Sequence, residues 1–128
     1  MGPIATDVKG QLESRGEPLG DWVMTPDECR SGQVQDFYGV DLHSSADTQL
    51  GVRIIRDPPR GDLVNVNIPG SDNRAVQFSA DQCDRFDVAI ERTSKSKNDI
   101  RLLDGHLQLD CKTTGGRIHG DITFTNCD

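Results

Sequence analysis

The four cysteines are the residues whose spacing says most about the chemistry of this 128-residue chain. Cys29, Cys83, Cys111 and Cys127 form no C-x-x-C pair, and no histidine lies at ligand spacing from them. A structural zinc site normally needs such clustering. An even number of dispersed cysteines instead favours disulfides, which persist in oxidising compartments. We therefore expect all of them to be oxidised, the alternative being a cytoplasmic protein with reduced thiols.

Strand geometry bears on which cysteines pair, because four cysteines allow three pairings. We expect residues 107–111 and 117–125 to form a hairpin around Gly115-Gly116. Cys111 would then lie at the turn and Cys127 beyond the far end, roughly 25–30 Å away at about 3.3 Å per residue. A disulfide needs Cα atoms within about 7 Å of each other, so these two cysteines are not expected to pair.

A second expected hairpin, with its tip at residues 94–98, places Cys83 opposite the region that ends at Cys111. This register assumes that Asp104-Gly105 is a bulge inside one long strand and not a tight turn of its own. The preferred disulfides are therefore Cys83–Cys111 and Cys29–Cys127.

No arrangement of residues in the chain matches a known catalytic, metal-binding or phosphate-binding motif. Asp81, Asp84 and Asp87 lie near one another, but they do not match the D-x-[DN]-x-[DN]-G calcium loop. The histidines are widely spaced, each in or beside an expected strand, as ordinary surface histidines are: His43, His106 and His119. We therefore expect no catalytic residue, no bound metal and no cofactor.

Positive charge gathers at the second hairpin, in Arg92, Lys95, Lys97 and Arg101. Such a cluster in an otherwise acidic chain suits an anionic partner such as a polysaccharide or a lipid headgroup. Lysines at a hairpin tip also have a simpler role, since they keep the tip soluble and block the pairing of sheet edges.

The tripeptide Arg60-Gly61-Asp62 is a further candidate surface, because integrins recognise this sequence in some extracellular proteins. It follows two prolines in an expected exposed loop, but the same tripeptide is common in turns and arises by chance. Aromatic residues also anchor interfaces. The chain has few of them, so we expect core packing for at least two of this set: Trp22, Phe37 and Tyr38.

The elements expected to position these residues are strands. Val64, Val66 and Ile68 alternate with Asn65 and Asn67, and the same period of two recurs along the chain. This alternation is typical of half-buried strands, and turn-forming segments separate the runs at short intervals. We predict an all-β fold, an antiparallel β-sandwich or small barrel of about seven to nine short strands.

The chain is expected to hold one domain. Residues 1–20 show little apolar periodicity and are predicted to be a flexible arm, with an edge strand near residues 4–8 as the alternative. Residues 21–128 would form a single disulfide-bonded β domain. Within it, residues 25–29 and 79–83 share the pattern [S/T]-x-D-[E/Q]-C, which matches a capping box. This repeated pattern predicts two single helical turns, each just before a strand.

The net charge of −7 and the isoelectric point near 4.8 disfavour nucleic-acid binding, which needs a positive field. No apolar stretch approaches the roughly 18 residues of a membrane span. The first residues are polar and do not resemble a signal peptide, so export would require a leader that has been removed. The prediction leaves open a lipid anchor outside this sequence.

The segments 105–111 and 118–127 carry the patterns G-x-L-x-L-x-C and I-x-G-x-[IV]-x-F-x-x-C. They resemble the closing hairpin of small exported bacterial lipoprotein-like domains of unassigned function. The resemblance covers only the C-terminal hairpin and implies no catalytic residue. It implies a protein of the bacterial cell envelope and transfers no activity. We expect a periplasmic, cell-surface or secreted domain that binds a protein or a glycan without catalysis. The alternative functions are an inhibitor of a secreted or periplasmic enzyme and, third, a hydrolase.

Overall fold

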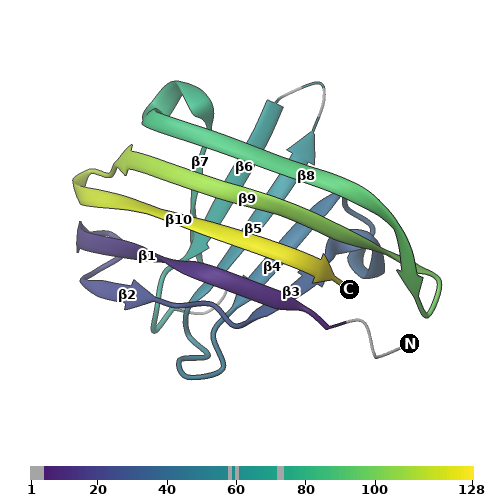
Figure 1. The fold of residues 1–128 in the computed structure, drawn as a ribbon. Helices are drawn as coiled ribbons and strands as arrows, with labels where there is room; N and C mark the ends of the chain where they lie inside the picture. Colours follow the sequence, from purple (N-terminus) through teal and green to yellow (C-terminus); the bar gives the residue numbers. More distant parts are fainter. Residues whose placement is uncertain (1–4, 58, 60, 72–73) are drawn as a thin grey trace.

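The computed structural model describes residues 5–57, 59, 61–71 and 74–128 of the chain. These residues form two antiparallel five-stranded sheets that face each other as a β-sandwich (Figure 1). The predicted all-β sandwich is therefore confirmed. Among the described residues no helix is long and apolar enough to cross a membrane.

The first sheet has the strand order β2-β1-β10-β9-β8. Its strands are β1 (Asp7–Glu17), β2 (Trp22–Met24), β8 (Cys83–Lys97), β9 (Ile100–Lys112) and β10 (Gly115–Cys127). The second sheet has the order β3-β4-β5-β6-β7. Its strands are β3 (Glu28–Ser31), β4 (Gly39–His43), β5 (Gly51–Asp57), β6 (Gly61–Asn67) and β7 (Ala75–Phe78). Two short 3₁₀ turns, η1 (Gly32–Gln35) and η2 (Ala80–Gln82), complete the described structure.

The described residues thus contain ten strands, more than the seven to nine expected, and the last three are long. One reason for their length is that β9 continues through residues 104–105 without a turn. Gly105 faces Phe124 of β10, and a Cβ atom there would lie only 2.8 Å from the Phe124 ring. The missing side chain therefore makes room for the aromatic ring, which covers the glycine as in designed sheets.

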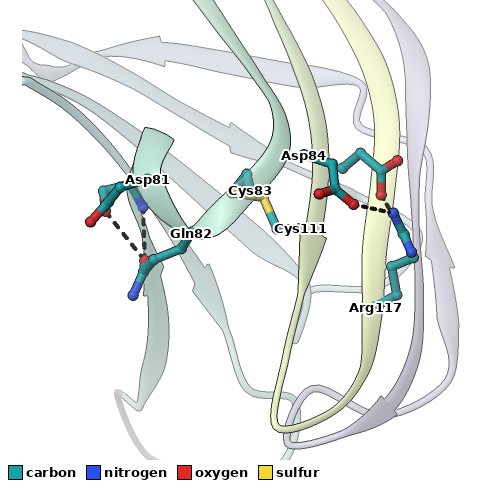
Figure 2. Close-up of a disulfide and its surroundings, with 8 residues drawn as sticks. Asp81, Gln82, Cys83, Asp84, Cys111 and Arg117 are labelled. Atoms are coloured by element: carbon teal, nitrogen blue, oxygen red, sulfur yellow. Dashed lines mark hydrogen bonds and ion pairs between the residues drawn. A yellow bond between two sulfur atoms is a disulfide. The ribbon is translucent and has the colours of Figure 1, made fainter.

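Disulfide pairing follows from this register, and both predicted pairs are confirmed. Cys83 of β8 lies directly opposite Cys111 of β9, and the two are bonded (Figure 2). Cys29 of β3 is bonded to Cys127 of β10, with 98 residues of sequence separation. The second bond joins one sheet to the other, whereas the first links neighbouring strands of one sheet.

The flexible arm predicted for residues 1–20 is wrong over β1, which pairs with β10 along its whole length and with β2 on its other side. The sequence hides this strand because few of its core-facing positions are apolar. Leu12 is fully buried, but Ser14 is buried as a hydrogen-bond donor to the carbonyl of Gly20. Gly10 has a φ of +107° and lies too close to Asp121 of β10 for any side chain. An apolar pattern is therefore absent from a central strand.

The two predicted helical turns have different outcomes. η2 forms at residues 80–82, and the backbone N–H of Ser79 donates to Oε1 of Gln82 as in a capping box. Residues 25–29 form no helical turn, because Asp27 instead accepts hydrogen bonds from the backbone N–H and hydroxyl of Ser45. The chain then enters β3, and the other turn, η1, follows β3.

The core fills the space between the sheets, as the period-two pattern predicts. On β10, Ile122 and Phe124 are buried while Thr123 between them is exposed. Other buried apolar side chains come from both sheets: Val40, Leu42, Ile54, Val64, Leu107, Leu109 and Ile118.

Replacing Phe124 with alanine is expected to lower the free energy of unfolding by about 3–5 kcal/mol, because it empties a buried site and uncovers Gly105. Thr123→Ala on the opposite face is the matched control and should cost under about 1 kcal/mol. Urea denaturation of both variants measures the difference. Similar losses would show that side chains do not alternate there as described.

Candidate functional site

A cavity of about 490 Å³ opens between the β8–β9 hairpin and η1. Its volume falls within the range of small-molecule sites. Its lining mixes arginine, aromatic and polar side chains, and we call it the arginine–aromatic cavity: Ser31, Gln33, Asp36, Phe37, Tyr38, Arg92, Arg101 and Leu103.

The η1 side of the cavity is shaped by a tight reversal of the chain. The Ser31 side chain caps the turn by accepting from the backbone N–H of Gln33 at 3.2 Å. Asp36 then takes the left-handed conformation, with a φ of 62°. This change of direction ends the turn just before Phe37 and Tyr38, which both line the cavity.

Gln33 fastens η1 to the hairpin on the other side. Its Nε2 donates to the carbonyl of Asp99 at 3.2 Å, and its Oε1 accepts from the backbone N–H of Arg101 at 3.3 Å. The Gln33 side chain therefore links η1 to a hairpin that is 66 to 68 residues away in sequence.

The two arginines give the cavity its electrostatic character. The guanidinium carbon of Arg92 lies 4.8 Å from the centroid of the Tyr38 ring, within the range of a cation–π contact. Arg101 donates from Nη1 to the carbonyl of Thr93 at 3.3 Å. Within the part of the chain that the structure describes, neither arginine has a carboxylate partner.

Arg53 on β5 shows the opposite arrangement. Its Nε and Nη2 donate to the two carboxylate oxygens of Asp41 at 2.7 and 3.0 Å. This bidentate hydrogen bonding raises the pKa of Arg53 above its ordinary value. Its guanidinium also lies 4.4 Å from the centroid of Phe37. The charge of Arg53 is thus balanced by the Asp41 carboxylate, whereas Arg92 and Arg101 line the cavity without such a partner among the described residues.

The predicted basic surface is divided by the structure. Arg92 and Arg101 line the cavity, while Lys95 and Lys97 are exposed on the hairpin outside the lining. Lys97 pairs with the Asp128 side chain at 3.3 Å. The sequence therefore singled out four lining residues, these two arginines together with Phe37 and Tyr38. It gave no signal for Ser31, Gln33 or Asp36, whose segment has no periodicity and joins the site only through tertiary contacts.

The other candidate residues lie elsewhere. Gly61 and Asp62 begin β6, and Asp62 pairs with Arg56 at 3.1 Å. Arg60 lies outside the described residues, so the tripeptide as a unit is untested. Of the three aromatic candidates, Trp22 and Tyr38 pack against the core, and Tyr38 and Phe37 also line the cavity.

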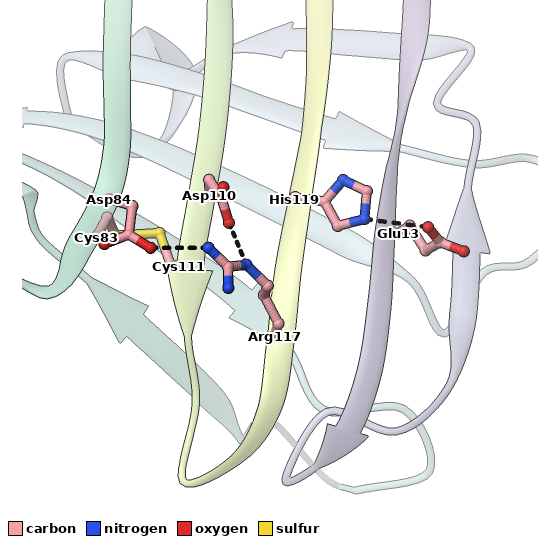
Figure 3. A network of polar contacts seen from close by, with 7 residues as sticks. All are labelled: Glu13, Cys83, Asp84, Asp110, Cys111, Arg117 and His119. Carbon is pink, nitrogen blue, oxygen red and sulfur yellow. Dashed lines mark hydrogen bonds and ion pairs between the residues drawn. A yellow bond between two sulfur atoms is a disulfide. The ribbon is translucent and has the colours of Figure 1, made fainter.

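A polar network lies on the outer face of the first sheet (Figure 3). Arg117 of β10 donates to Asp110 of β9 at 2.5 Å and to Asp84 of β8 at 2.7 Å. Beside it, Nε2 of His119 lies 3.1 Å from a carboxylate oxygen of Glu13 on β1. The Arg117 hydrogen bond holds the pKa of Asp110 below its ordinary value. Arg117 therefore joins β8, β9 and β10 by paired charges and keeps Asp110 ionised, and the His119–Glu13 contact adds β1.

No protein-family model, no curated protein and no solved structure matches this chain. Its function is therefore inferred from the geometry of the cavity and from the two disulfides, which suggest an oxidising, extracytoplasmic location.

Proposed function

We propose that this protein is an extracytoplasmic binding domain whose ligand site is the arginine–aromatic cavity. The observation that carries the proposal is the pair of arginines, Arg92 and Arg101, that face a cavity without a carboxylate partner among the described residues. A guanidinium prefers to bind a carboxylate or phosphate through paired hydrogen bonds. Their charge is available to a ligand because the fold does not neutralise it.

The carboxylates with shifted pKa values support a structural role. A carboxyl group that acts as a general acid has a raised pKa. Among the described residues, the two carboxyl groups with a clear shift are Asp27 and Asp110, whose pKa values are lowered by hydrogen bonds from Ser45 and Arg117. Asp110 stays ionised and joins β9 to β10 through Arg117, which supports a role in stability for the outer network. Asp27 joins the segment before β3 to the loop after β4 through Ser45.

The location that we propose is the bacterial envelope, in the periplasm, at the cell surface or in the medium. The disulfides support an oxidising compartment, and the resemblance of the closing hairpin to exported lipoprotein-like domains supports the envelope. A protein or a glycan is the partner class that an exposed cavity of this kind would meet there.

The test is retention of envelope material on immobilised protein. We expect the wild type to retain a component that the Arg92→Gln/Arg101→Gln variant does not. Lys9→Gln/Lys112→Gln is the matched control, because it removes the same charge away from the cavity lining. Loss of retention in the first variant alone supports the proposal. Equal retention by all three proteins would place the binding surface elsewhere.

The second candidate function is inhibition of a secreted or periplasmic enzyme by the β8–β9 hairpin. Residues 94–99 are all exposed, and Asn98 and Asp99 form a tight turn with φ values of 52° and 66°. Gln33 binds the turn of this hairpin at Asp99 and Arg101, so the hairpin presents an ordered loop of the kind that fills an enzyme cleft. This function predicts that Lys95→Glu at the hairpin abolishes partner binding, while Arg92→Gln leaves it intact.

A further inference from the structure

We infer that the ligand of the arginine–aromatic cavity is a sugar that carries a carboxylate, such as a uronic acid residue of an envelope glycan. This inference rests on the proposed function and specifies its ligand. It depends on four kinds of group that line one cavity: two guanidinium groups with no carboxylate partner among the described residues, one carboxylate, one buried hydroxyl and two aromatic side chains.

The guanidinium groups select for negative charge. Arg92 lies over the Tyr38 ring, and Arg101 donates to the backbone carbonyl of Thr93. These contacts restrict both side chains to positions beside the cavity. A ligand carboxylate placed between them would accept charge-assisted hydrogen bonds, which are stronger than neutral ones.

Asp36 argues against a simple inorganic anion. Its side chain lines the same cavity, and no cation or hydrogen-bond donor contacts its carboxylate among the described residues. A phosphate or sulfate in the cavity would be repelled by this charge. A sugar instead offers hydroxyl groups that donate to Asp36 while its carboxylate binds the arginines.

Ser31 supplies a hydrogen-bond donor to the cavity. Its side chain is only 6% exposed and lines the cavity. The Oγ atom accepts from the Gln33 backbone N–H. Its O–H can donate to a ligand oxygen in the cavity.

Phe37 and Tyr38 add aromatic lining for the carbon-bound hydrogens of a sugar ring. One guanidinium already lies over each ring, Arg53 over Phe37 and Arg92 over Tyr38, and Leu103 is only 3% exposed. The protein's net charge of −7 disfavours a dense polyanion. A glycan with isolated carboxylates therefore suits the cavity better than a highly sulfated polymer or a nucleic acid.

The experiment compares two disaccharides that differ only in the carboxylate. Cellobiouronic acid and cellobiose are titrated into the wild-type protein and binding is followed by NMR. We expect cellobiouronic acid to bind at least about tenfold more tightly than cellobiose, since hydrogen bonds to charged groups are the stronger ones. Inorganic phosphate and a tripeptide with a free carboxylate are titrated in parallel.

Three variants locate the effect. Arg92→Gln and Arg101→Gln should each weaken binding of cellobiouronic acid by about tenfold or more. Lys95→Gln removes the same charge from the same hairpin outside the cavity and should change binding by less than about twofold. Thermal unfolding of each variant shows that the fold is retained.

The outcomes separate the two proposals. If phosphate or the tripeptide binds as tightly as cellobiouronic acid, the sugar class is overturned while the cavity remains an anion site. If cellobiouronic acid does not bind but retention of envelope material still depends on Arg92 and Arg101, the ligand is overturned and the proposed function stands. If neither measurement depends on these arginines, both proposals fail.

Discussion

A chain that lacks residues 1–17 is expected not to fold into a cooperative structure. The deletion removes β1, which lies between β2 and β10 in the middle of the first sheet. β10 would lose an eleven-residue pairing, and β2 would lose its only partner strand among the described residues. The fully buried Leu12 would also be lost from the core. Typical domains are stable by only about 5–15 kcal/mol, which is too little to absorb all of these losses.

Urea denaturation followed by circular dichroism measures this effect. The full-length protein should show one cooperative transition and the shortened chain none. Leu12→Ala and Gln11→Ala in the full-length chain are the matched pair, because Leu12 is buried and Gln11 is exposed. Leu12→Ala should cost about 2–5 kcal/mol and Gln11→Ala under about 0.5. A cooperative transition of the shortened chain near the full-length midpoint would show that β1 is dispensable.

Replacing Cys29 and Cys127 with alanine is expected to produce the second largest loss. Their bond closes a segment of 98 residues and joins the two sheets. In the chain-entropy account of disulfides, a loop of about this length contributes about 4.7 kcal/mol to the free energy of unfolding. Both cysteines are also buried, so their removal disturbs core packing.

The Cys83→Ala/Cys111→Ala variant is the internal comparison. Its disulfide closes only 28 residues between strands that are already neighbours. The same account gives about 3.6 kcal/mol for such a loop. Equilibrium urea unfolding of both double variants should rank the inter-sheet bond as the more important by about 1 kcal/mol. The reverse ranking would contradict the chain-entropy explanation for this fold.

The sheets and the disulfide pairing could be predicted because they depend on local regularities. Alternation such as Ile122-Thr123-Phe124 assigns each side chain to one face of a strand. Once residues 104–105 are placed inside a strand, the hairpin register puts Cys83 opposite Cys111. The remaining two cysteines then pair with each other.

The failures have a common physical origin in tertiary contacts. β1 is held by pairing with its neighbours on both sides, so Ser14 can take a core-facing position in place of an apolar residue. The capping pattern at residues 25–29 was overridden because Asp27 binds Ser45 from a distant loop. The cavity could be predicted only in part, because Gln33 meets Arg101 through folding and not through sequence spacing.

The location of the ligand site is tested most directly by NMR mapping of the wild-type protein at saturation with cellobiouronic acid. The account predicts that the largest backbone amide shifts fall on Gln33, Asp36, Tyr38, Arg92 and Arg101, the residues around the cavity. His106 and Asp121, on the outer face of the first sheet, should change little. Shifts centred on that outer face would contradict the assignment of the arginine–aromatic cavity as the binding site, whereas an unchanged spectrum would overturn a carboxylated sugar as its ligand.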